Sequence, residues 1–524
     1  MSETHQITRA AGIVGGATFV SRILGFVRDV VVAWFFGAGL AADAFFVAFR
    51  IPNLLRRLFA EGSLTISFVP VFSEYFYRHG RDEAFRLARS TWWILTILLV
   101  LVTLIGIVFA PIIVRLIAPG FYSAPDKFEL TVLLTRIMFP YIFFIALVAL
   151  AMGILNSLGS FGPPAFAPVL LNIAMIASVL FLAPRLGQPA LALAVGVIAG
   201  GILQLALQMV SMVKKGFRLF VRGPVYHAAV KRIAGLMTPA VLGAAVYQLN
   251  VFVGTLLASL LPEGSVSYLY YADRLVQFPL GVFAIALATA VLPTLSKQAA
   301  QGDAAGLRES FSYALRMVFF ITIPAMIGLI VLREPIVRLL FERGAFGAGT
   351  TRLTAEALLY YAVGLWAFSG VRVVVSTFYA LQDTKTPVKM AVISLLANIV
   401  LSILLMGPMR HGGLALATSI ASGLNLGLLV VALRKRLGRI GGRDILRSVV
   451  RSLVSALFMG LVVAFGAMWV HPLCGQSAWC LLVVVLGSMA LGAVLYMVGG
   501  RLLGCPELGA VGEMVKTGIR KGKA

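Results

Sequence analysis

The chain has 524 residues, of which 60% are hydrophobic and 12% charged, and its formal net charge at pH 7 is +24. Soluble domains carry about 25% charged residues, so this composition and a mean hydropathy of +0.98 exclude an ordinary soluble protein. Apolar runs long enough to cross about 30 Å of hydrocarbon recur from end to end. They predict an all-α polytopic membrane protein, whose excess Lys and Arg meets anionic lipid rather than nucleic acid.

The apolar runs divide the chain into fourteen predicted transmembrane helices. In chain order they are residues 9–36, 40–76, 86–117, 128–156, 164–184, 188–213, 229–261, 265–297, 307–341, 352–381, 387–406, 412–433, 446–470 and 477–499. Lys and Arg concentrate in alternate connections, and by the positive-inside rule this places both termini in the cytoplasm. The first apolar run is too long for a cleavable signal peptide.

The first twelve predicted helices fall into two similar sets of six. Pro164 opens the fifth span and Pro387 the eleventh, and three other short matches share their spacing of about 223 residues. Because six is even, the two sets have the same orientation, which is typical of alternating-access transporters. We therefore expect two pseudo-symmetric six-helix lobes, 1–222 and 223–440, two extra C-terminal helices within 441–500, and a basic cytoplasmic tail, 501–524, against the inner leaflet.

Four arginines lie deep in predicted spans of both lobes. Arg22 is about 20 Å into the first span, Arg56 lies at a similar depth in the second, and Arg274 is about 13 Å along the eighth. Arg28 lies further along the first span. A charge in hydrocarbon is costly unless it faces protein or a wet cavity, and the guanidinium fork suits phosphate. The pattern predicts a central cationic cavity for an anionic head group, with phosphate favoured.

Several nearby residues could complete this site. Candidate charge partners of the arginines are Asp29, Glu61 and Asp273. Asp43, near the outer mouth, is a candidate for substrate binding. In the alternative interpretation these carboxylates and the arginines form purely structural ion pairs. Further candidates for substrate binding are Asn53, Ser21 and Ser267, although serine hydroxyls in helices also bond back to their own backbone.

Other chemistry has little support in the sequence. It contains no Walker A, GxSxG or HExxH motif, and its five histidines form no ligand cluster, so we expect neither an enzyme nor a metal site or cofactor. Cys474 and Cys480 could pair, but with only three cysteines we expect free thiols.

The charged segments resemble the MurJ/MviN lipid II flippases of the MOP exporter superfamily, over essentially all fourteen helices. The motifs that carry the resemblance are SRILGFVRD at 21–29, DAFFVAFRIPNLLRRLFAEG at 43–62 and YYADR at 270–274. The resemblance implies movement of lipid II, the undecaprenyl-diphosphate-linked peptidoglycan precursor, from the inner to the outer leaflet of the bacterial cytoplasmic membrane. The implied partners are lipid II and the phospholipid bilayer, with cell-wall synthesis enzymes as further candidates.

The same resemblance implies roles for individual residues. Arg22, Arg28 and Arg56 would bind the diphosphate, with Asp43 and Arg274 also important, and the last two helices would form a groove for the polyprenyl tail. The chain departs from many relatives at Gln277, where they have an acid one turn after Arg274. Some relatives use a sodium site with acids in the second lobe, which we do not carry over.

Two other classes of function stay open. A multidrug or cation antiporter should show midplane acids and twelve spans, and a flippase for another polyprenyl-diphosphate glycan would share the arginines. A non-transporting scaffold that binds lipid diphosphate would not need the repeat. Coupling to the membrane potential or to an ion gradient is a hypothesis for the energy source.

Overall fold

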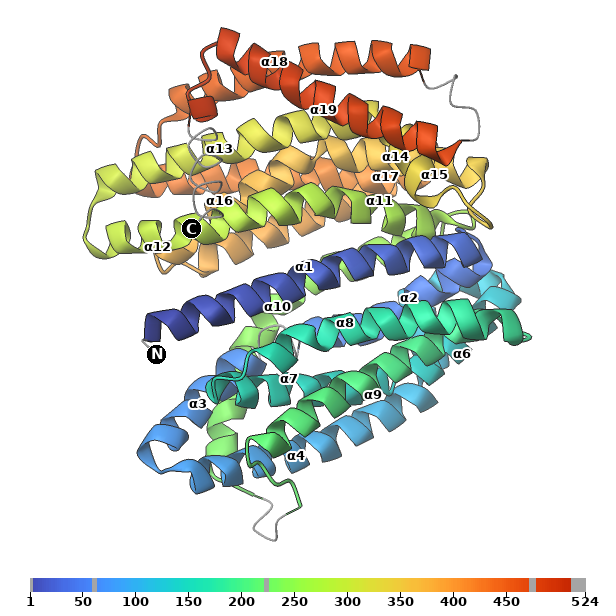
Figure 1. Cartoon of the computed structure of the whole chain (residues 1–524), viewed down its shortest axis with the longest axis vertical. Helices are drawn as coiled ribbons and strands as arrows, with labels where there is room; N and C mark the ends of the chain where they lie inside the picture. Colours follow the sequence, from blue (N-terminus) through green and yellow to red (C-terminus); the bar gives the residue numbers. More distant parts are fainter. Residues whose placement is uncertain (1–2, 59–63, 221–225, 471–476, 510–524) are drawn as a thin grey trace. The chain divides into compact units, whose positions relative to one another are not determined.

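The computed structural model describes residues 3–58, 64–220, 226–470 and 477–509, and these residues form helices joined by short turns (Figure 1). The α-helices are α1 (Glu3–Phe36), α2 (Leu40–Leu58), α3 (Leu64–Arg78), α4 (Arg81–Val108), α5 (Ala110–Ile117), α6 (Pro125–Met138), α7 (Tyr141–Ser157), α8 (Gly162–Ala177), α9 (Leu191–Lys214), α10 (Ala229–Ser259), α11 (Ser265–Pro279), α12 (Ile285–Ala300), α13 (Ala304–Val331), α14 (Arg333–Phe341), α15 (Ala348–Val363), α16 (Leu365–Ala380), α17 (Lys385–Leu437), α18 (Gly442–Val470) and α19 (Ala478–Leu502).

Within the described residues, nine helical segments are long and apolar enough to cross a membrane, or ten if α15 and α16, bent by 42°, form one span. The all-helical membrane class is thus confirmed, whereas the number fourteen stays a prediction. Four predicted spans separate ten from fourteen. The counted segments include neither α1 nor α2, which carry several charges, and α10 contributes only the shorter apolar helix Gln248–Ser259. α17 runs through two predicted spans with a kink at Arg410, whose φ is 48°.

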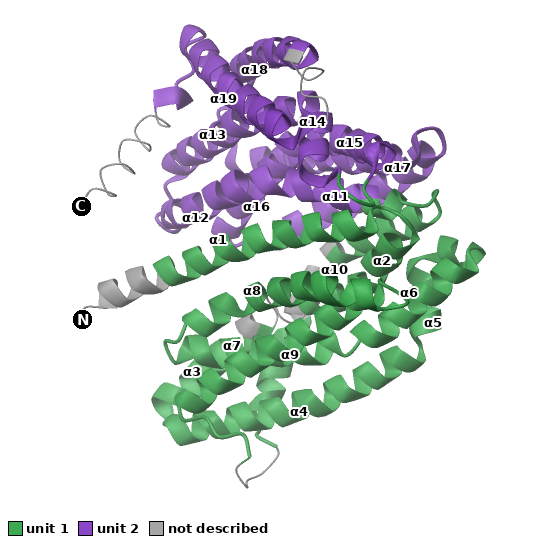
Figure 2. Ribbon diagram, turned by 45° about the vertical axis from the view of Figure 1, so that its right-hand side comes forward, with its two compact units in different colours: residues 1–267, 343–346 green, residues 268–342, 347–524 purple. Residues whose placement is uncertain are grey.

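Contacts divide the chain into two compact units (Figure 2). Unit 1 comprises Met1–Ser267 and Arg343–Phe346, and unit 2 comprises Tyr268–Glu342 and Gly347–Ala524. α10 therefore packs with unit 1, although the repeat assigns it to the second lobe. The lobes 1–222 and 223–440 describe a sequence repeat rather than these contact units, and they remain an expectation.

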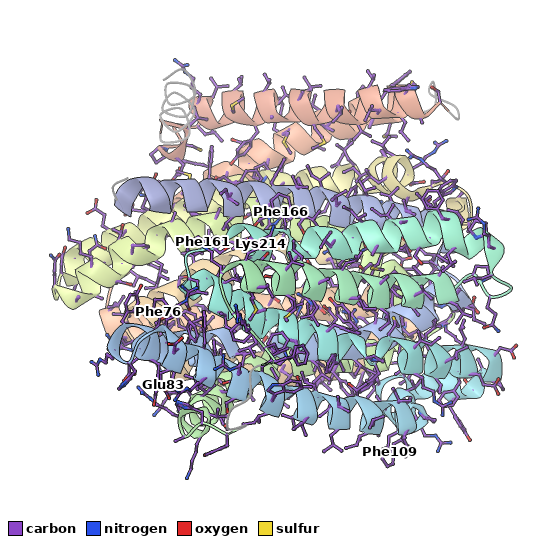
Figure 3. All side chains as sticks on the ribbon, turned by 60° about the horizontal axis from the view of Figure 1, so that its bottom comes forward. Phe76, Glu83, Phe109, Phe161, Phe166 and Lys214 are labelled. Carbon is purple, nitrogen blue, oxygen red and sulfur yellow. The ribbon has the colours of Figure 1, made fainter. Side chains whose placement is uncertain are left out.

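Unit 1 is built around α7, most of whose residues are buried. α9 packs against both α7 and α8, α1 lies along α8, and α2 packs against α6. α4 lies at the surface of the unit, with Glu83 near its start and Phe109 just beyond its end (Figure 3). Because α4 exposes many large apolar residues between these ends, its outer face suits contact with lipid.

Unit 2 packs α13 against α16 and α18, with α19 beside α18. Glycine permits the close approach of α18 to α13, since a Cβ on Gly460 would lie 2.5 Å from Ile327. The outer faces of α18 and α19 expose large apolar side chains such as Leu461 and Val483. The two extra C-terminal helices thus attach by one side and leave the other available to lipid.

The basic cytoplasmic tail 501–524 stays a prediction, and the expectation of free thiols is wrong for one cysteine. At the start of the tail, Cys505 and Glu507 are buried in unit 2. Glu507 accepts a 3.0 Å hydrogen bond from Ser448 and lies 3.5 Å from Arg316. Residues 510–524, the remainder of the expected tail, lie outside the described residues. Cys480 is disulfide-bonded rather than free, while Cys474 also lies outside the described residues.

Candidate functional site

Asp43 is the most highly connected residue of the predicted site. Its carboxylate, 1% exposed, accepts a 2.6 Å bond from the ammonium of Lys127 and a 2.8 Å bond from the N–H of Gly264. The backbone and hydroxyl of Ser267 donate two more, at 3.0 and 2.6 Å. These donors come from α6, from the turn before α11 and from the first turn of α11. Asp43 therefore fastens the start of α2 to two other elements of unit 1.

This arrangement gives two of the predicted residues a structural role, and their contact with the substrate stays a prediction. Asp43 and Ser267 were predicted to contact the substrate, but both are buried and bonded to each other. A carboxylate that already accepts four hydrogen bonds has no capacity left for a ligand. In this conformation they position helices. Asp43 lies in the first turn of α2, and Asn53 and Arg56 lie in the second half of the same helix.

Arg28 lies in a buried polar network within unit 1. Its Nη2 forms a 2.7 Å salt bridge with Asp29, and its Nη1 donates to Asn172 of α8 at 3.2 Å. The amide nitrogen of Asn172 in turn donates to the backbone oxygen of Ser21 at 3.1 Å. The network fixes the guanidinium of Arg28 and joins it to the turn of α1 that carries Arg22. Ser21 thus takes part through its backbone carbonyl.

The other two arginines of unit 1 predicted to bind the substrate, Arg22 and Arg56, are more accessible than Arg28. Arg22 is exposed and makes no hydrogen bond or ion pair with the described part of the chain. Arg56 is half-buried, and its Nε donates to the side-chain oxygen of Asn53, one turn earlier, at 3.1 Å. Asn53 follows Pro52, which lies inside α2. Arg22 can thus reach a ligand directly, and Asn53 orients Arg56.

Arg274 and Asp273 belong to the part of α11 that lies in unit 2. Both are half-buried. Gln277 donates a hydrogen bond to the carboxylate of Asp273, so the residue that departs from the family pattern satisfies a neighbouring acid. The other predicted charge partner, Glu61, lies outside the described residues. The sequence prediction that arginines of both lobes share one cavity remains a prediction.

Sequence reasoning missed Lys127 and Asn172. Lys127 occurs in a loop segment that we treated as poor in cations, yet its ammonium is buried and lies 4.1 Å from the ring centre of Phe121. Asn172 left a signal, because it is a lone amide within the apolar helix α8. A lone polar residue in such a helix needs a partner. Among the described residues, no group of three or more His, Cys, Asp or Glu could hold a metal ion.

Comparisons with known proteins identify the family of the chain. Residues 32–484 match the family model described as "Lipid II flippase MurJ". A probable lipid II flippase MurJ of Vibrio cholerae serotype O1 is 41% identical over 433 residues, 81% of this chain and 82% of that protein. The Haemophilus influenzae relative of the same name is 38% identical, covering 92% and 98%.

Solved structures extend the likeness to the fold. The structure titled "Lipid II flippase MurJ, inward closed conformation" matches with a TM-score of 0.78 and 29% identity, covering 94% of this chain and 99% of that one. An inward-facing MATE multidrug transporter of the MOP superfamily matches with a TM-score of 0.69 at 16% identity, which shows a shared fold alone. On the extent of the family match and of these relatives, the chain belongs to the MurJ family of lipid II flippases.

Proposed function

We propose that this protein flips lipid II from the inner to the outer leaflet of the bacterial cytoplasmic membrane, acting as a transporter rather than an enzyme. The observation that carries the proposal is the placement of Arg22, Arg28 and Arg56 on two charged helices of a chain that belongs to this family. Lipid II carries a diphosphate, and the guanidinium fork suits phosphate oxygens bidentately.

The polar network supports this role for the arginines. A diphosphate that leaves water must exchange its hydration for fixed donors. Asp29 and Asn172 hold Arg28 in one orientation, and Asn53 holds Arg56. Donors that are already oriented lose less conformational entropy when the ligand binds. Arg22, which is exposed, would be the first of these cations that the substrate meets.

Transport needs two conformations with different affinity for the substrate. We propose that the Asp43 contacts stabilise the conformation that is closed at the outer end of α2. Release of Gly264 and Ser267 from Asp43 would free the start of α11 and permit opening to the outside. The two six-helix lobes would then move relative to each other by alternating access. Both termini would lie in the cytoplasm.

The polyprenyl tail presents a separate problem, because it cannot enter a polar cavity. The outer faces of α18 and α19 carry exposed apolar side chains, including Phe465 and Val483. We propose that the tail stays in lipid along these helices while the head group crosses. The membrane potential could bias the cycle, since an inside-negative potential favours outward movement of an anion by about 2.3 kcal/mol per charge per 100 mV.

A vesicle assay tests the proposal. The purified chain is reconstituted with fluorescent lipid II, and transfer between leaflets is followed by a reagent that reaches only the outer one. We expect transfer in wild-type vesicles and none with Arg22→Ala. A chain that binds lipid II without changing its leaflet distribution would instead be a scaffold. If collapse of the potential at fixed ion gradients leaves transfer unchanged, coupling to the potential is wrong.

A further inference from the structure

Unit 1 contains a cavity of about 210 Å³ that the proposed function does not use. It lies between α2, the end of α5 and α10. Its walls are mostly apolar, with Leu54 and Phe252 on opposite helices. The polar side chains that reach it are Arg50, Asn53, Arg57, Gln248 and Thr255. No carboxylate is among the lining residues that the structure describes.

Arg50 has no counter-charge in the described part of the chain. It makes no hydrogen bond or ion pair with the described residues, and its Nε is fully buried. Arg50 lies about 15 Å along α2 from Leu40, at a depth where an unpaired guanidinium is costly. Arg57 lies two turns further on, so both guanidinium groups line the same face of the helix and the same cavity.

Gln248 faces these arginines from α10. Its side chain is only 7% exposed, yet its amide has no hydrogen-bond partner among the described residues. A buried amide without a partner is unfavourable unless a ligand or water satisfies it. Asn53 supplies a further donor, because its oxygen already accepts from Arg56 and its amide nitrogen remains. Donors from two helices thus meet in a cavity whose described lining includes no acid.

We propose that this cavity is a second oxyanion site that takes a phosphate group, separate from the Arg22 and Arg28 cluster. Two guanidinium groups and two amides suit the oxygens of a phosphate, which accept several hydrogen bonds at once. The phosphate can come from a phospholipid head group, whose chain the apolar walls would accommodate, or from free inorganic phosphate. Asn53 lines this cavity and also accepts a hydrogen bond from Arg56. Phosphate bound in the cavity would therefore affect the orientation of Arg56 in the transport site.

The first experiment uses inorganic phosphate and the full chain in nanodiscs of phosphatidylcholine alone. Phosphate, compared with chloride at equal ionic strength, should raise the melting temperature of the wild type, because a ligand that binds only the folded state stabilises it. Arg50→Gln and Gln248→Leu should each lose at least half of that shift. Arg372→Gln, which changes an exposed arginine of α16 that does not line the cavity, should retain it.

The second experiment distinguishes the two sources of phosphate. Nanodiscs that contain phosphatidylglycerol are examined by native mass spectrometry for lipid retained after mild delipidation. A lipid source predicts one retained phosphatidylglycerol in the wild type and none in Arg50→Gln. If the ligand is free inorganic phosphate, phosphate should raise the melting temperature but no lipid should be retained. The site is overturned if the wild type shows neither effect, or if Arg50→Gln and Gln248→Leu behave like the wild type in both experiments.

The variant Arg22→Ala separates this inference from the proposed function. It should lose transport yet keep the part of the phosphate shift that depends on Arg50, because Arg22 does not line the cavity. The double variant Arg22→Ala/Arg50→Gln should lose that remaining shift. If Arg22→Ala removes the whole shift by itself, phosphate binds only at the transport site and the second site is wrong.

Discussion

The hydroxyl of Ser267 donates a 2.6 Å hydrogen bond to the carboxylate of Asp43, 224 positions earlier in the chain. The same carboxylate forms a buried ion pair with Lys127. One acid thus joins the starts of α2 and α11 to α6. Because these contacts are buried, their loss should change both stability and the balance between conformations.

Replacement of Asp43 by Asn should destabilise the protein strongly. Lys127 is 5% exposed and would keep its charge without a partner. Removal of one member of a buried ion pair costs about 3–5 kcal/mol. Thermal unfolding in nanodiscs measures the loss. The double variant Asp43→Asn/Lys127→Met should recover much of it, and if the double variant is no more stable than the single one, the ion pair does not explain the effect.

Asn172 should matter for transport although it is not one of the predicted arginines. Asn172→Leu removes the hydrogen bonds to Arg28 and to the carbonyl of Ser21. Each hydrogen bond contributes about 1 kcal/mol. Loss of both should therefore reduce the rate of lipid II transfer at least tenfold. Asn172→Asp keeps an acceptor for Arg28 and should be less impaired. Equal activity of Asn172→Leu and the wild type in the vesicle assay would contradict the positioning role.

Arg22 should be required as an arginine. Arg22→Ala should fail to support growth of cells that depend on this protein, while the variant still inserts at wild-type levels. Arg22→Lys should also be poor, because an ammonium lacks the planar fork that binds two phosphate oxygens. Arg372→Ala is the matched control and should support growth. Normal growth with Arg22→Ala would show that this guanidinium does not bind the substrate.

The turn before α17 should be sensitive to acid. The backbone N–H of Thr386 holds the pKa of Asp383 below its usual value, with help from the Thr386 hydroxyl, Arg436 and the N–H of Lys385, against the opposing effect of burial. A lowered pKa means that the folded state favours the carboxylate. Its contribution to stability is therefore complete above the ordinary pKa and is lost as the pH falls through the lowered one.

Melting temperatures of the wild type and Asp383→Asn test this dependence. The wild type should be the more stable at neutral pH, and the difference should shrink as the pH falls below about 4. Arg436→Gln should show a smaller pH-dependent difference, because it removes the 2.8 Å bond to Asp383 and the 3.3 Å bond to the carbonyl of Leu381 but leaves the backbone donors to Asp383. If the difference in melting temperature between the wild type and Asp383→Asn does not vary with pH, the charge of Asp383 does not contribute to stability.

The sequence predicts the helices and the cationic segments well, because apolar length and charge depth are properties of a single helix. It does not predict the partners of Asp43, since Lys127 and Ser267 come from distant segments whose approach depends on tertiary packing. The burial of Glu507 has the same cause. An acidic residue near the start of a basic tail is expected to be solvated until its contacts with α13 and α18 are known.

The cavity beside α2 shows a further limit. The sequence alone does not show that Arg50 makes no hydrogen bond or ion pair with the described residues, or that Gln248 of α10 lines the same cavity. Only the packing of α2 against α10 places them in one cavity.

The central claim is that this protein moves a lipid-linked diphosphate between leaflets. Its most direct test is leaflet-resolved labelling of lipid II in cells depleted of the protein, with rescue by the wild type or by Arg22→Ala. We predict that lipid II in the outer leaflet falls while the inner pool grows, and that only the wild type reverses this change. An unchanged distribution of lipid II after depletion would contradict the account.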